Sequence, residues 1–446
     1  IRDSYYPYNH HPSFFICLKF ISSHIFNYIL NESILKGGGI LKNKFLQATF
    51  ILMVGGLITK LLGFGIRIIY TRMVGSDAIN LYSLVMPTYS LLLTIATLSL
   101  PVVISKLISE HKTKSIKILS SATIITLILN FIVITTIYFT KDFIATTLLN
   151  DPRCSTLLMA MALTFPFVSL SSILKGYFYG KQKMAPHTIS NIIEQIVRLA
   201  LIFLIIPKLV NMGIVYSVMG LILISIASEL ASILIFLAFL PKKFKITKED
   251  LKPDMKTSKE ILSISIPTVS GRLIGNIGFF FEPILLTNIL LFAGYSMDFI
   301  LNEYGAYNAY TISLLSMPSF FIAAISSSLL PEISKFYYKK NLIMVKRRLK
   351  QAVILSFIVG GIFSAFIYLF REPLLSTLYN TTKGSEYIEI LAPFFVLFYL
   401  EGPLQSVLQA IGKAKTTMFI TMVAVITKLV TMSILSLCHI GMYSLV

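Results

Sequence analysis

The stretch Gly55–Gly75, GGLITKLLGFGIRIIYTRMVG, decides the fold. It lies in an apolar run that begins near Phe45 and is long enough to cross a bilayer, yet it contains Lys60, Arg67 and Arg72. A cation near the middle of a span costs at least a few kcal/mol, so such residues normally face a wet interior lined by protein. Lys60 and Arg67 fall on nearly one helix face, and Arg72 is placed to reach the interface. We therefore predict a first transmembrane helix that presents positive charge to a cavity.

The composition indicates a polytopic membrane protein. Of the 446 residues 55% are apolar and 13% are charged, and the mean hydropathy is +0.79. A soluble domain carries about 25% charged residues. The net charge of +19 could indicate nucleic-acid binding, but the basic residues cluster in short loops between apolar runs. The positive-inside rule explains that pattern more simply, so we expect a lipid bilayer and no nucleic acid as partner.

Apolar runs of about 20 residues predict an all-α fold with about 12 transmembrane helices. We expect two pseudo-symmetric six-helix bundles around a central cavity. We expect a twelfth span to begin near Gly441 and to be truncated at Val446. The eleven complete candidates are residues 46–72, 81–105, 118–140, 155–178, 188–207, 213–240, 261–291, 307–333, 351–370, 388–411 and 417–437.

An internal repeat supports the two bundles. Met86-Pro87 followed by Leu100-Pro101 is matched by Met317-Pro318 followed by Leu330-Pro331, and each pair precedes Ile-Ser-Lys and a basic loop. Gly180-Lys-Gln-Lys is matched later by Gly412-Lys-Ala-Lys. Halves with an even number of spans enter from the same side, which predicts parallel repeats with a substrate site between them.

The chain divides into four predicted parts. Residues 1–40 are an uncertain leader, because the chain opens on Ile and the apolar stretch 14–30 is interrupted by polar residues. We expect native translation to start near Ile40 or Leu41, and a further span or a signal peptide is the alternative. Residues 41–240 form the N-terminal bundle, 241–260 a connecting loop and 261–446 an incomplete C-terminal bundle.

Loop charge predicts the orientation. Counted from Lys42, the amino-terminal flank and alternate loops hold 25 Lys and Arg residues, whereas the opposite loops hold about 6. The start of the core and the 241–260 loop are therefore expected on the cytoplasmic side of a plasma membrane.

Charged residues within the spans are the candidate site residues. Lys60, Arg67, Arg72, Arg198 and Arg272 are the predicted substrate-binding cations. Glu194 and Glu282 are predicted as ion-coupling or pairing carboxylates, and Glu194 can pair with Arg198 at i,i+4. We expect structural roles for three further charges and close helix packing at a group of glycines. These are Glu229, Glu401, Lys428, Gly271, Gly275 and Gly278.

A cavity lined by Lys and Arg suits phosphate or carboxylate ligands. We therefore expect an anionic amphiphile or a lipid-linked headgroup as the substrate. The three separated cysteines and six histidines show no disulfide or metal spacing, and no phosphate-binding G-x-x-x-x-G-K-[ST] loop occurs. We expect no metal, no cofactor and no catalytic residues.

Three motifs resemble the stage V sporulation protein B family, from the polysaccharide-exporter branch of the multidrug/oligosaccharidyl-lipid/polysaccharide flippase superfamily. They are residues 60–75, the segment Leu100-Pro101 to Glu110, and Gly176-Tyr-Phe-Tyr-Gly180. The resemblance covers residues 40–446. It implies alternating access and translocation of an undecaprenyl-pyrophosphate-linked cell-wall or polysaccharide precursor, specifically lipid II for the spore cortex. Lys60, Arg67 and Arg72 fall where the family has basic cavity residues.

Two alternatives remain open. A drug or cation antiporter of the same superfamily would need a proton- or sodium-binding carboxylate facing the cavity, and Glu194, Glu282 and Glu401 qualify. A membrane-embedded glycosyltransferase or polymerase would need acidic or His residues in large external loops, and the external loops are short. Coupling to the membrane potential or to a monovalent ion is compatible with the first interpretation.

Overall fold

The computed structural model describes residues 44–110, 114–181, 183–240, 254–438 and 440–446. Within these ranges the chain is helical and contains no strand, which confirms the all-α prediction. The leader and residues 241–253 of the connecting loop lie outside the described residues. The helices are α2 (Lys44–Thr97), α3 (Leu100–Ser109), α4 (Ser115–Phe143), η2 (Ile144–Leu148), α5 (Cys154–Gly180), α6 (Met184–Val210), α7 (Ile214–Ala238), α8 (Met255–Phe292), α9 (Met297–Gly305), η3 (Ala306–Ile312), α10 (Ser313–Leu315), α11 (Ser319–Tyr338), α12 (Leu342–Leu369), α13 (Arg371–Tyr379), α14 (Ser385–Ala410), α15 (Ala414–Leu437) and η4 (Gly441–Ser444).

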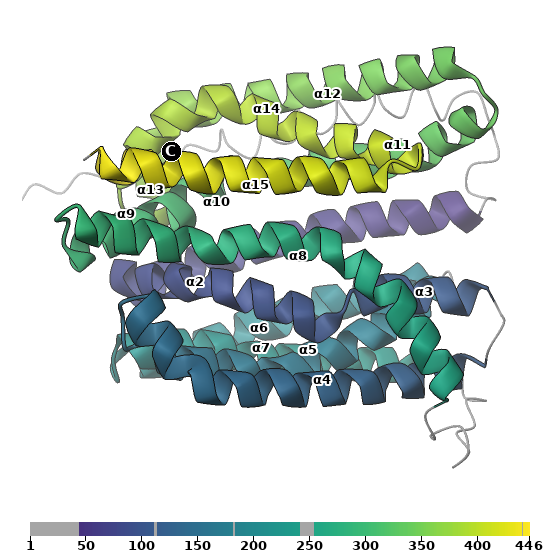
Figure 1. Cartoon of the computed structure of the whole chain (residues 1–446), viewed down its shortest axis with the longest axis horizontal. Coiled ribbons are helices and arrows are strands. Elements are labelled where there is room, and N and C mark those ends of the chain that lie inside the picture. Colours follow the sequence, from purple (N-terminus) through teal and green to yellow (C-terminus); the bar gives the residue numbers. More distant parts are fainter. Residues whose placement is uncertain (1–43, 111–113, 182, 241–253, 439) are drawn as a thin grey trace, which may run out of the picture.

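Nine helices in the described part are long and apolar enough to cross a membrane, or ten if the bent pair Met297–Leu315 and Ser319–Tyr338 is one span. The predicted spans coincide with these helices, and the one from Val54 to Ser109 contains two of them. Gly75 separates the two arms with φ 80° and ψ 176°, a conformation that favours glycine. Both ends of α2 therefore lie at the same end of the molecule (Figure 1). The 3-10 helix η4 lies where a twelfth span was predicted to begin.

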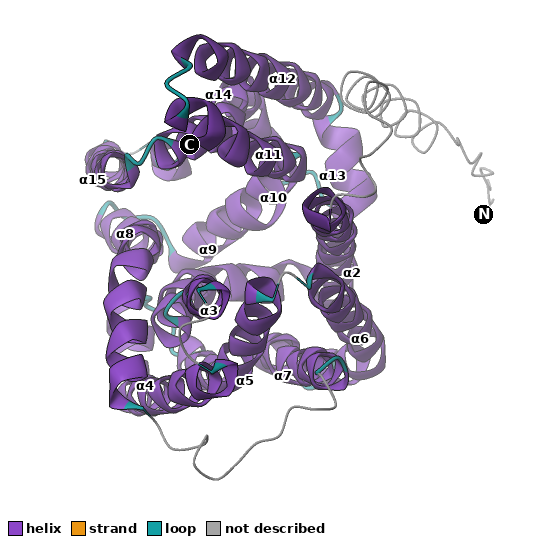
Figure 2. Cartoon of the chain, turned by 90° about the vertical axis from the view of Figure 1, so that its right-hand side faces the viewer, coloured by secondary structure: helices purple, strands orange, loops and turns teal. Residues whose placement is uncertain are grey.

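The helices form two groups, which we call the N-terminal and C-terminal lobes. Figure 2 shows α3–α7 in one group and α11–α15 in the other, with α2 and α8 on opposite sides between them. We count α2 with the N-terminal lobe because it contacts α5, α6 and α7, and we count the segment from α9 to α10 with the C-terminal lobe because η3 and α10 contact α14. One apolar core cluster contains residues of both lobes, among them Ile66, Ile202, Tyr304 and Ile388. Since α8 contacts α3 and α4 as well as α15, the division at residues 241–260 remains a prediction.

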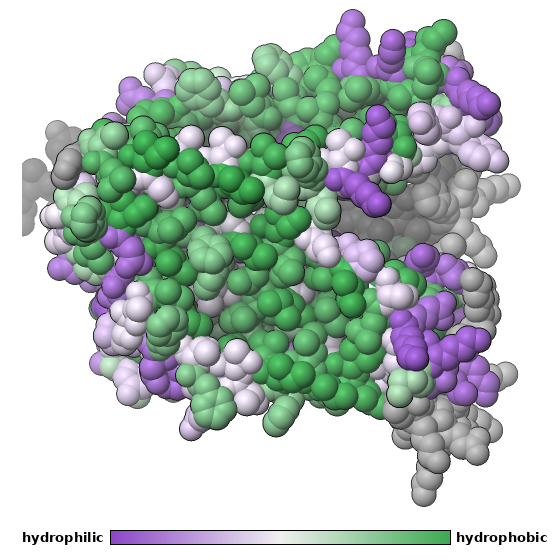
Figure 3. Space-filling model, viewed as in Figure 1, coloured by the Kyte–Doolittle hydropathy of each residue, from purple (hydrophilic) through white to green (hydrophobic). Residues whose placement is uncertain are grey.

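The outer surface matches a bilayer. In Figure 3 apolar side chains cover the middle of the visible face, and the hydrophilic side chains gather towards its ends. Large apolar residues of α4 and α6, such as Phe131, Phe139 and Phe203, are exposed because the hydrocarbon core, not water, is the solvent expected around these spans.

The predicted glycine packing is partly wrong. A Cβ on Gly278 would lie 2.3 Å from Val425 Cγ1, so this glycine does allow α8 to approach α15 closely. Gly271 and Gly275 instead have no atom within 4 Å of an added Cβ and face open space. A close contact of the predicted kind also occurs at Gly55, where a Cβ would lie 2.1 Å from Thr188 Cγ2 of α6.

The two halves of the sequence repeat occupy similar places but bend differently. Gly180-Lys-Gln-Lys leads from α5 to α6, and Gly412-Lys-Ala-Lys leads from α14 to α15. In the first half the chain breaks at Ser99, just before Pro101, where φ is 53°. In the second half the break lies at Pro318, before α11, while Pro331 lies inside that helix.

Candidate functional site

The first arm of α2 turns its cationic face towards the C-terminal lobe. Arg67 is exposed, and its Nη2 donates to the carbonyl oxygen of Asn308 in the π-helix η3 at 3.0 Å. Lys60 is also exposed, and no hydrogen bond or ion pair to its Nζ is found within the described residues. Gly56, one turn before Lys60, faces open space. Lys60 and Arg67 share a helix face, so the contact of Arg67 with Asn308 indicates that this face is directed towards η3.

Arg72 lies one turn further along α2 and bonds to the end of α13. Its Nε donates to the carbonyl of Leu378 at 2.9 Å, and its Nη2 donates to the carbonyl of Thr377. The helix ends at Asn380, which has a left-handed φ of 57°. A cation at a helix C-terminus satisfies orphan carbonyls and opposes the negative end of the macrodipole. Arg72 therefore joins the two lobes. It lies at the end of the first span, as its position in the sequence predicts.

Arg272 belongs to the other helix between the lobes. It is exposed on α8, and the structure as described places no hydrogen-bond or ion-pair partner on its guanidinium. Asn276 lies one turn further on, and its Nδ2 donates to Thr94 Oγ1 of the second α2 arm at 2.6 Å. Residues four apart share a helix face, so the face that carries Arg272 is turned towards α2.

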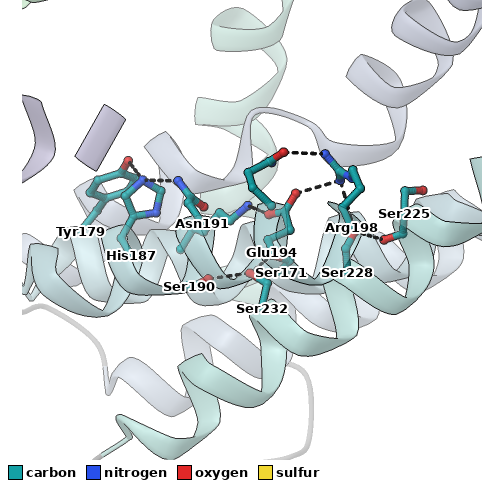
Figure 4. Close-up of polar contacts among 12 residues, drawn as sticks. Ser171, Tyr179, His187, Ser190, Asn191, Glu194, Arg198, Ser225, Ser228 and Ser232 are labelled. Carbon is teal, nitrogen blue, oxygen red and sulfur yellow. Dashed lines mark hydrogen bonds and ion pairs between the residues drawn. The ribbon is translucent and has the colours of Figure 1, made fainter. Parts of the chain in front are cut away.

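Arg198 belongs to a polar network inside the N-terminal lobe (Figure 4). Its Nη2 donates to Glu194 Oε1 at 2.9 Å and to Ser228 Oγ at 3.2 Å, and its Nη1 donates to Gln195 Oε1 at 3.4 Å. Lys175 Nζ lies 3.8 Å from the other oxygen of Glu194. The predicted i,i+4 pair is thus confirmed, and Glu194 has two cationic neighbours.

Glu282 is paired across two helices of the C-terminal half. Lys428 Nζ on α15 donates to Glu282 Oε2 at 2.6 Å, and the Tyr304 hydroxyl donates to Oε1 at 3.4 Å. The Glu282 side chain is 4% exposed, whereas that of Lys428 is 49% exposed. Sequence reasoning considered both charges but did not foresee this pairing. A separation of 146 residues offers no local signal for it.

Two further carboxylates have different surroundings. Glu401 is exposed and accepts from Gln405 Nε2 at 2.6 Å. Glu229 is buried in the N-terminal lobe, and its Oε2 has no hydrogen-bond partner in the part of the chain that the structure describes. A buried carboxylate oxygen without a hydrogen bond is costly, and the structural role expected for Glu229 stays a prediction.

The in-span cations therefore fall into two classes. Arg198 and Lys428 lie against carboxylates, which cancel much of their field. Lys60, Arg67 and Arg272 have no carboxylate within ion-pair distance among the described residues, and these three lie on the helices between the lobes. An anionic ligand between the lobes would therefore meet positive charges that have no acidic partner. The described residues contain no cluster suited to a metal ion.

Comparison with known proteins shows the family of the chain. A family model described as polysaccharide biosynthesis protein matches residues 45–337. Stage V sporulation protein B of Bacillus subtilis (strain 168) is 36% identical over an alignment of 399 residues that covers 87% of this chain and 77% of that protein. The chain belongs to the polysaccharide biosynthesis protein family, in the group of stage V sporulation protein B. Lipid II flippase MurJ of the same organism is 24% identical over 427 residues, covering 87% of this chain and 77% of that protein.

Solved structures show the same fold for this family member. An inward-facing multidrug resistance MATE family transporter of the MOP superfamily matches with a TM-score of 0.69 at 17% identity, covering 87% of this chain and 89% of that one. The outward-facing form of a MATE transporter matches at 0.60 and 16% identity, covering 92% and 93%. A second family model, MatE, matches residues 283–434. The two-lobe transporter fold is confirmed, and the chain is a multi-pass membrane transporter and not a glycosyltransferase.

Proposed function

We propose that this protein flips a polyprenyl-pyrophosphate-linked saccharide across the membrane by alternating access, with Lys60, Arg67 and Arg272 as headgroup contacts. The observation that carries the proposal is that these cations, on helices between the lobes, have no carboxylate partner among the described residues. The similarity to stage V sporulation protein B and to lipid II flippase MurJ supports a lipid-linked precursor. We infer lipid II for the spore cortex as the specific substrate.

The physical task of these cations is to replace water around a pyrophosphate. A phosphate group that enters a low-dielectric interior loses its hydration, which is costly without compensating bonds. Lys and Arg supply charge-assisted hydrogen bonds, and Arg67 can form two parallel bonds to one phosphate. The carbonyl of Asn308, its present partner, is neutral and can be exchanged for a charged oxygen.

The antiporter alternative receives less support. A cation antiporter requires a titratable carboxylate that is accessible to the transported cation. Glu194 and Glu282 are both buried and lie against cations. Glu401 is exposed and bonded to Gln405. Coupling of transport to the membrane potential or to a monovalent ion remains part of the proposal, with Glu194 and Glu282 as pairing groups.

We propose a plasma-membrane location with the basic loops in the cytoplasm. The two lobes are joined at the opposite end of the molecule, where Arg72 bonds to α13 and Asn80 Nδ2 donates to Asn302 Oδ1 at 2.9 Å. In this orientation the lobes meet on the external side, a state in which a substrate would enter from the cytoplasmic side.

Substitution of the three cations tests the proposal. In proteoliposomes, Lys60→Ala, Arg67→Ala and Arg272→Ala should each slow flipping of a fluorescent undecaprenyl-pyrophosphate saccharide about tenfold or more, because one charge-assisted bond contributes roughly 1.5–3 kcal/mol. Arg67→Lys should keep part of the activity if the site needs positive potential, and little if it needs the planar fork.

The matched control is Lys415→Ala, which removes an exposed lysine at the start of α15. It should flip the lipid at the wild-type rate. Equal reconstitution of all variants separates loss of transport from loss of folding. Fully active alanine variants at all three positions would contradict the proposed role of the cations.

A further inference from the structure

A dense group of cations lies where α11 is connected to α12. Residues 335–350 contain seven Lys and Arg residues and no Asp or Glu. Arg348 is partly buried, and its Nε forms an ion pair with Glu332 Oε2 of α11 at 3.0 Å. The nearest acidic residue in the sequence is therefore already paired. The other six cations are exposed, and we call them the basic patch: Lys335, Lys339, Lys340, Lys346, Arg347 and Lys350.

The helix face on which part of the basic patch lies shows what it meets. Lys346, Arg347 and Lys350 share one face of α12, because residues three and four apart lie above one another. The same face continues into the span with large apolar side chains that are about half exposed, namely Ile354, Phe357 and Ile358. The opposite face is buried where α12 contacts α11 and α14, and it contains Val345, Ala352, Ser356 and Val359. The three cations therefore point towards the bilayer and not into the protein.

The length of α12 places these cations among phospholipid headgroups. Its 28 residues correspond to about 42 Å, which exceeds the hydrocarbon core of about 30 Å. With Ile354 in the hydrocarbon, Lys350 lies one turn nearer the helix start, at the boundary with the headgroups. The helix start carries partial positive charge of its own, and the Asn341 side chain caps it. The field at this boundary therefore attracts phosphate.

We propose that the basic patch binds an anionic phospholipid of the bilayer, with the phosphate against Lys346, Arg347 and Lys350 and the acyl chains along Ile354 and Phe357. The positive-inside rule accounts for cations in this connection, but it does not specify a helix face. Clusters of cations next to a transmembrane helix attract anionic headgroups. The site lies on the outer surface, so the inference goes beyond the proposed transport. The bound lipid stabilises the α11–α12 hairpin by linkage.

A fluorescent reporter on the same face tests the proposal. The chain contains no tryptophan, so Phe357→Trp supplies a single indole beside the proposed acyl chains. The full chain is reconstituted into phosphatidylcholine vesicles that contain a fixed fraction of dibrominated phosphatidylglycerol or, in parallel, of dibrominated phosphatidylcholine. Bromine quenches an indole that it contacts, so quenching reports which lipid occupies the face. We expect phosphatidylglycerol to be preferred about fivefold or more.

Phe131→Trp is the matched reporter. Phe131 is exposed on α4, at a similar distance from the start of its helix, and the dense group of cations is not part of that helix. We expect a preference of less than about twofold there, because only the general attraction of a basic protein acts on the lipid.

Substitutions in the Phe357→Trp chain test the named cations. Lys346→Ala, Arg347→Ala and Lys350→Ala together should abolish the preference for phosphatidylglycerol. The control removes the same charge from exposed lysines elsewhere, by Lys183→Ala, Lys256→Ala and Lys259→Ala together, and should keep the preference. Gel filtration before reconstitution shows that each variant is folded. If the triple variant fails this step, single variants decide: Lys350→Gln should weaken the preference and Lys350→Arg should keep it.

Four results would overturn the proposal. Equal quenching by the two lipids at position 357 is the first, and it would favour an acidic protein as the partner of the basic patch. The others are an equal preference at position 131, full preference after loss of the α12 cations, and loss of preference in the charge-matched control. None of these measurements depends on whether the cations between the lobes flip a lipid-linked saccharide.

Discussion

Removing Lys428 from its ion pair with Glu282 should destabilise the protein more than removing the charge of Glu282. At 2.6 Å and an effective dielectric constant of 20 the attraction amounts to about 6 kcal/mol, and most of it is offset by desolvation. Removing one partner of a buried pair costs about 3–5 kcal/mol, because the other charge stays buried. Since the lysine side chain is 49% exposed, we expect about 2–3 kcal/mol for Lys428→Met and less than about 1 kcal/mol for Glu282→Gln.

The assay can use a native reporter. Cys154 is fully buried, so its thiol reacts with a fluorogenic maleimide only when the N-terminal lobe unfolds. Cys17 and the exposed Cys438 are first replaced by serine. On heating, Lys428→Met should unfold at a clearly lower temperature than Glu282→Gln, and the double variant should recover most of the loss, because no charge remains unpaired. Equal losses in the two single variants, or additive losses in the double variant, would refute the reasoning.

Two further predictions rest on named contacts, and a third rests on the distribution of loop charge. Arg72→Ala should raise amide hydrogen exchange in residues 371–384 several-fold, because charged hydrogen bonds contribute roughly 1.5–3 kcal/mol, and Arg72→Lys should be intermediate; unchanged exchange would show that α13 is held by packing alone. Hydrogen bonds from the Thr257 hydroxyl and from the backbone N–H groups of Thr257 and Lys256 lower the pKa of Asp254 at the start of α8. A carboxylate whose pKa is lowered on folding stabilises the folded protein above its unfolded pKa of about 4, and this stabilisation is lost as the pH falls through the folded pKa. The loss of stability caused by Asp254→Asn should therefore shrink between about pH 7 and pH 3. A loss of stability that does not change with pH would contradict this. A membrane-impermeant thiol reagent on intact cells should label cysteine at position 383 and not at 248 or 340, and the reverse pattern would invert the orientation.

The length of the apolar runs predicted most of the fold. A span of about 20 apolar residues has few alternatives to a transmembrane helix, because backbone groups cannot stay unpaired in lipid. The place of each bend was less predictable. Pro101 and Pro331 are equivalent in sequence, yet the chain breaks before the first and runs helically through the second. Proline removes one N–H and permits a bend, but the neighbouring helices determine whether the bend occurs.

Predictions about the site succeeded where the interaction is local. Glu194 and Arg198 are four residues apart on one helix, so their pairing follows from helical geometry. Glu282 and Lys428 meet where α15 packs on α8, with Gly278 allowing a close approach one turn away, and a single sequence does not encode such a tertiary contact locally. The same limit applies to Arg72, whose acceptors lie more than 300 residues away.

The partners of the two arginines on α2 explain how they can hold the lobes together and still serve an anion. Arg67 and Arg72 both bond to backbone carbonyls of the C-terminal lobe, and neither has a carboxylate within ion-pair distance in the described ranges. A carboxylate would cancel the guanidinium charge and compete with an anionic ligand for the same donors. A carbonyl leaves the full positive charge in place and forms a bond weaker than a phosphate would. Under the proposed function, the exchange of a carbonyl for a phosphate oxygen at Arg67 would be favourable, and it would remove a contact between the lobes in the same step. In this way binding of the anion can itself release the closed end, which a carboxylate at the position of Asn308 would prevent.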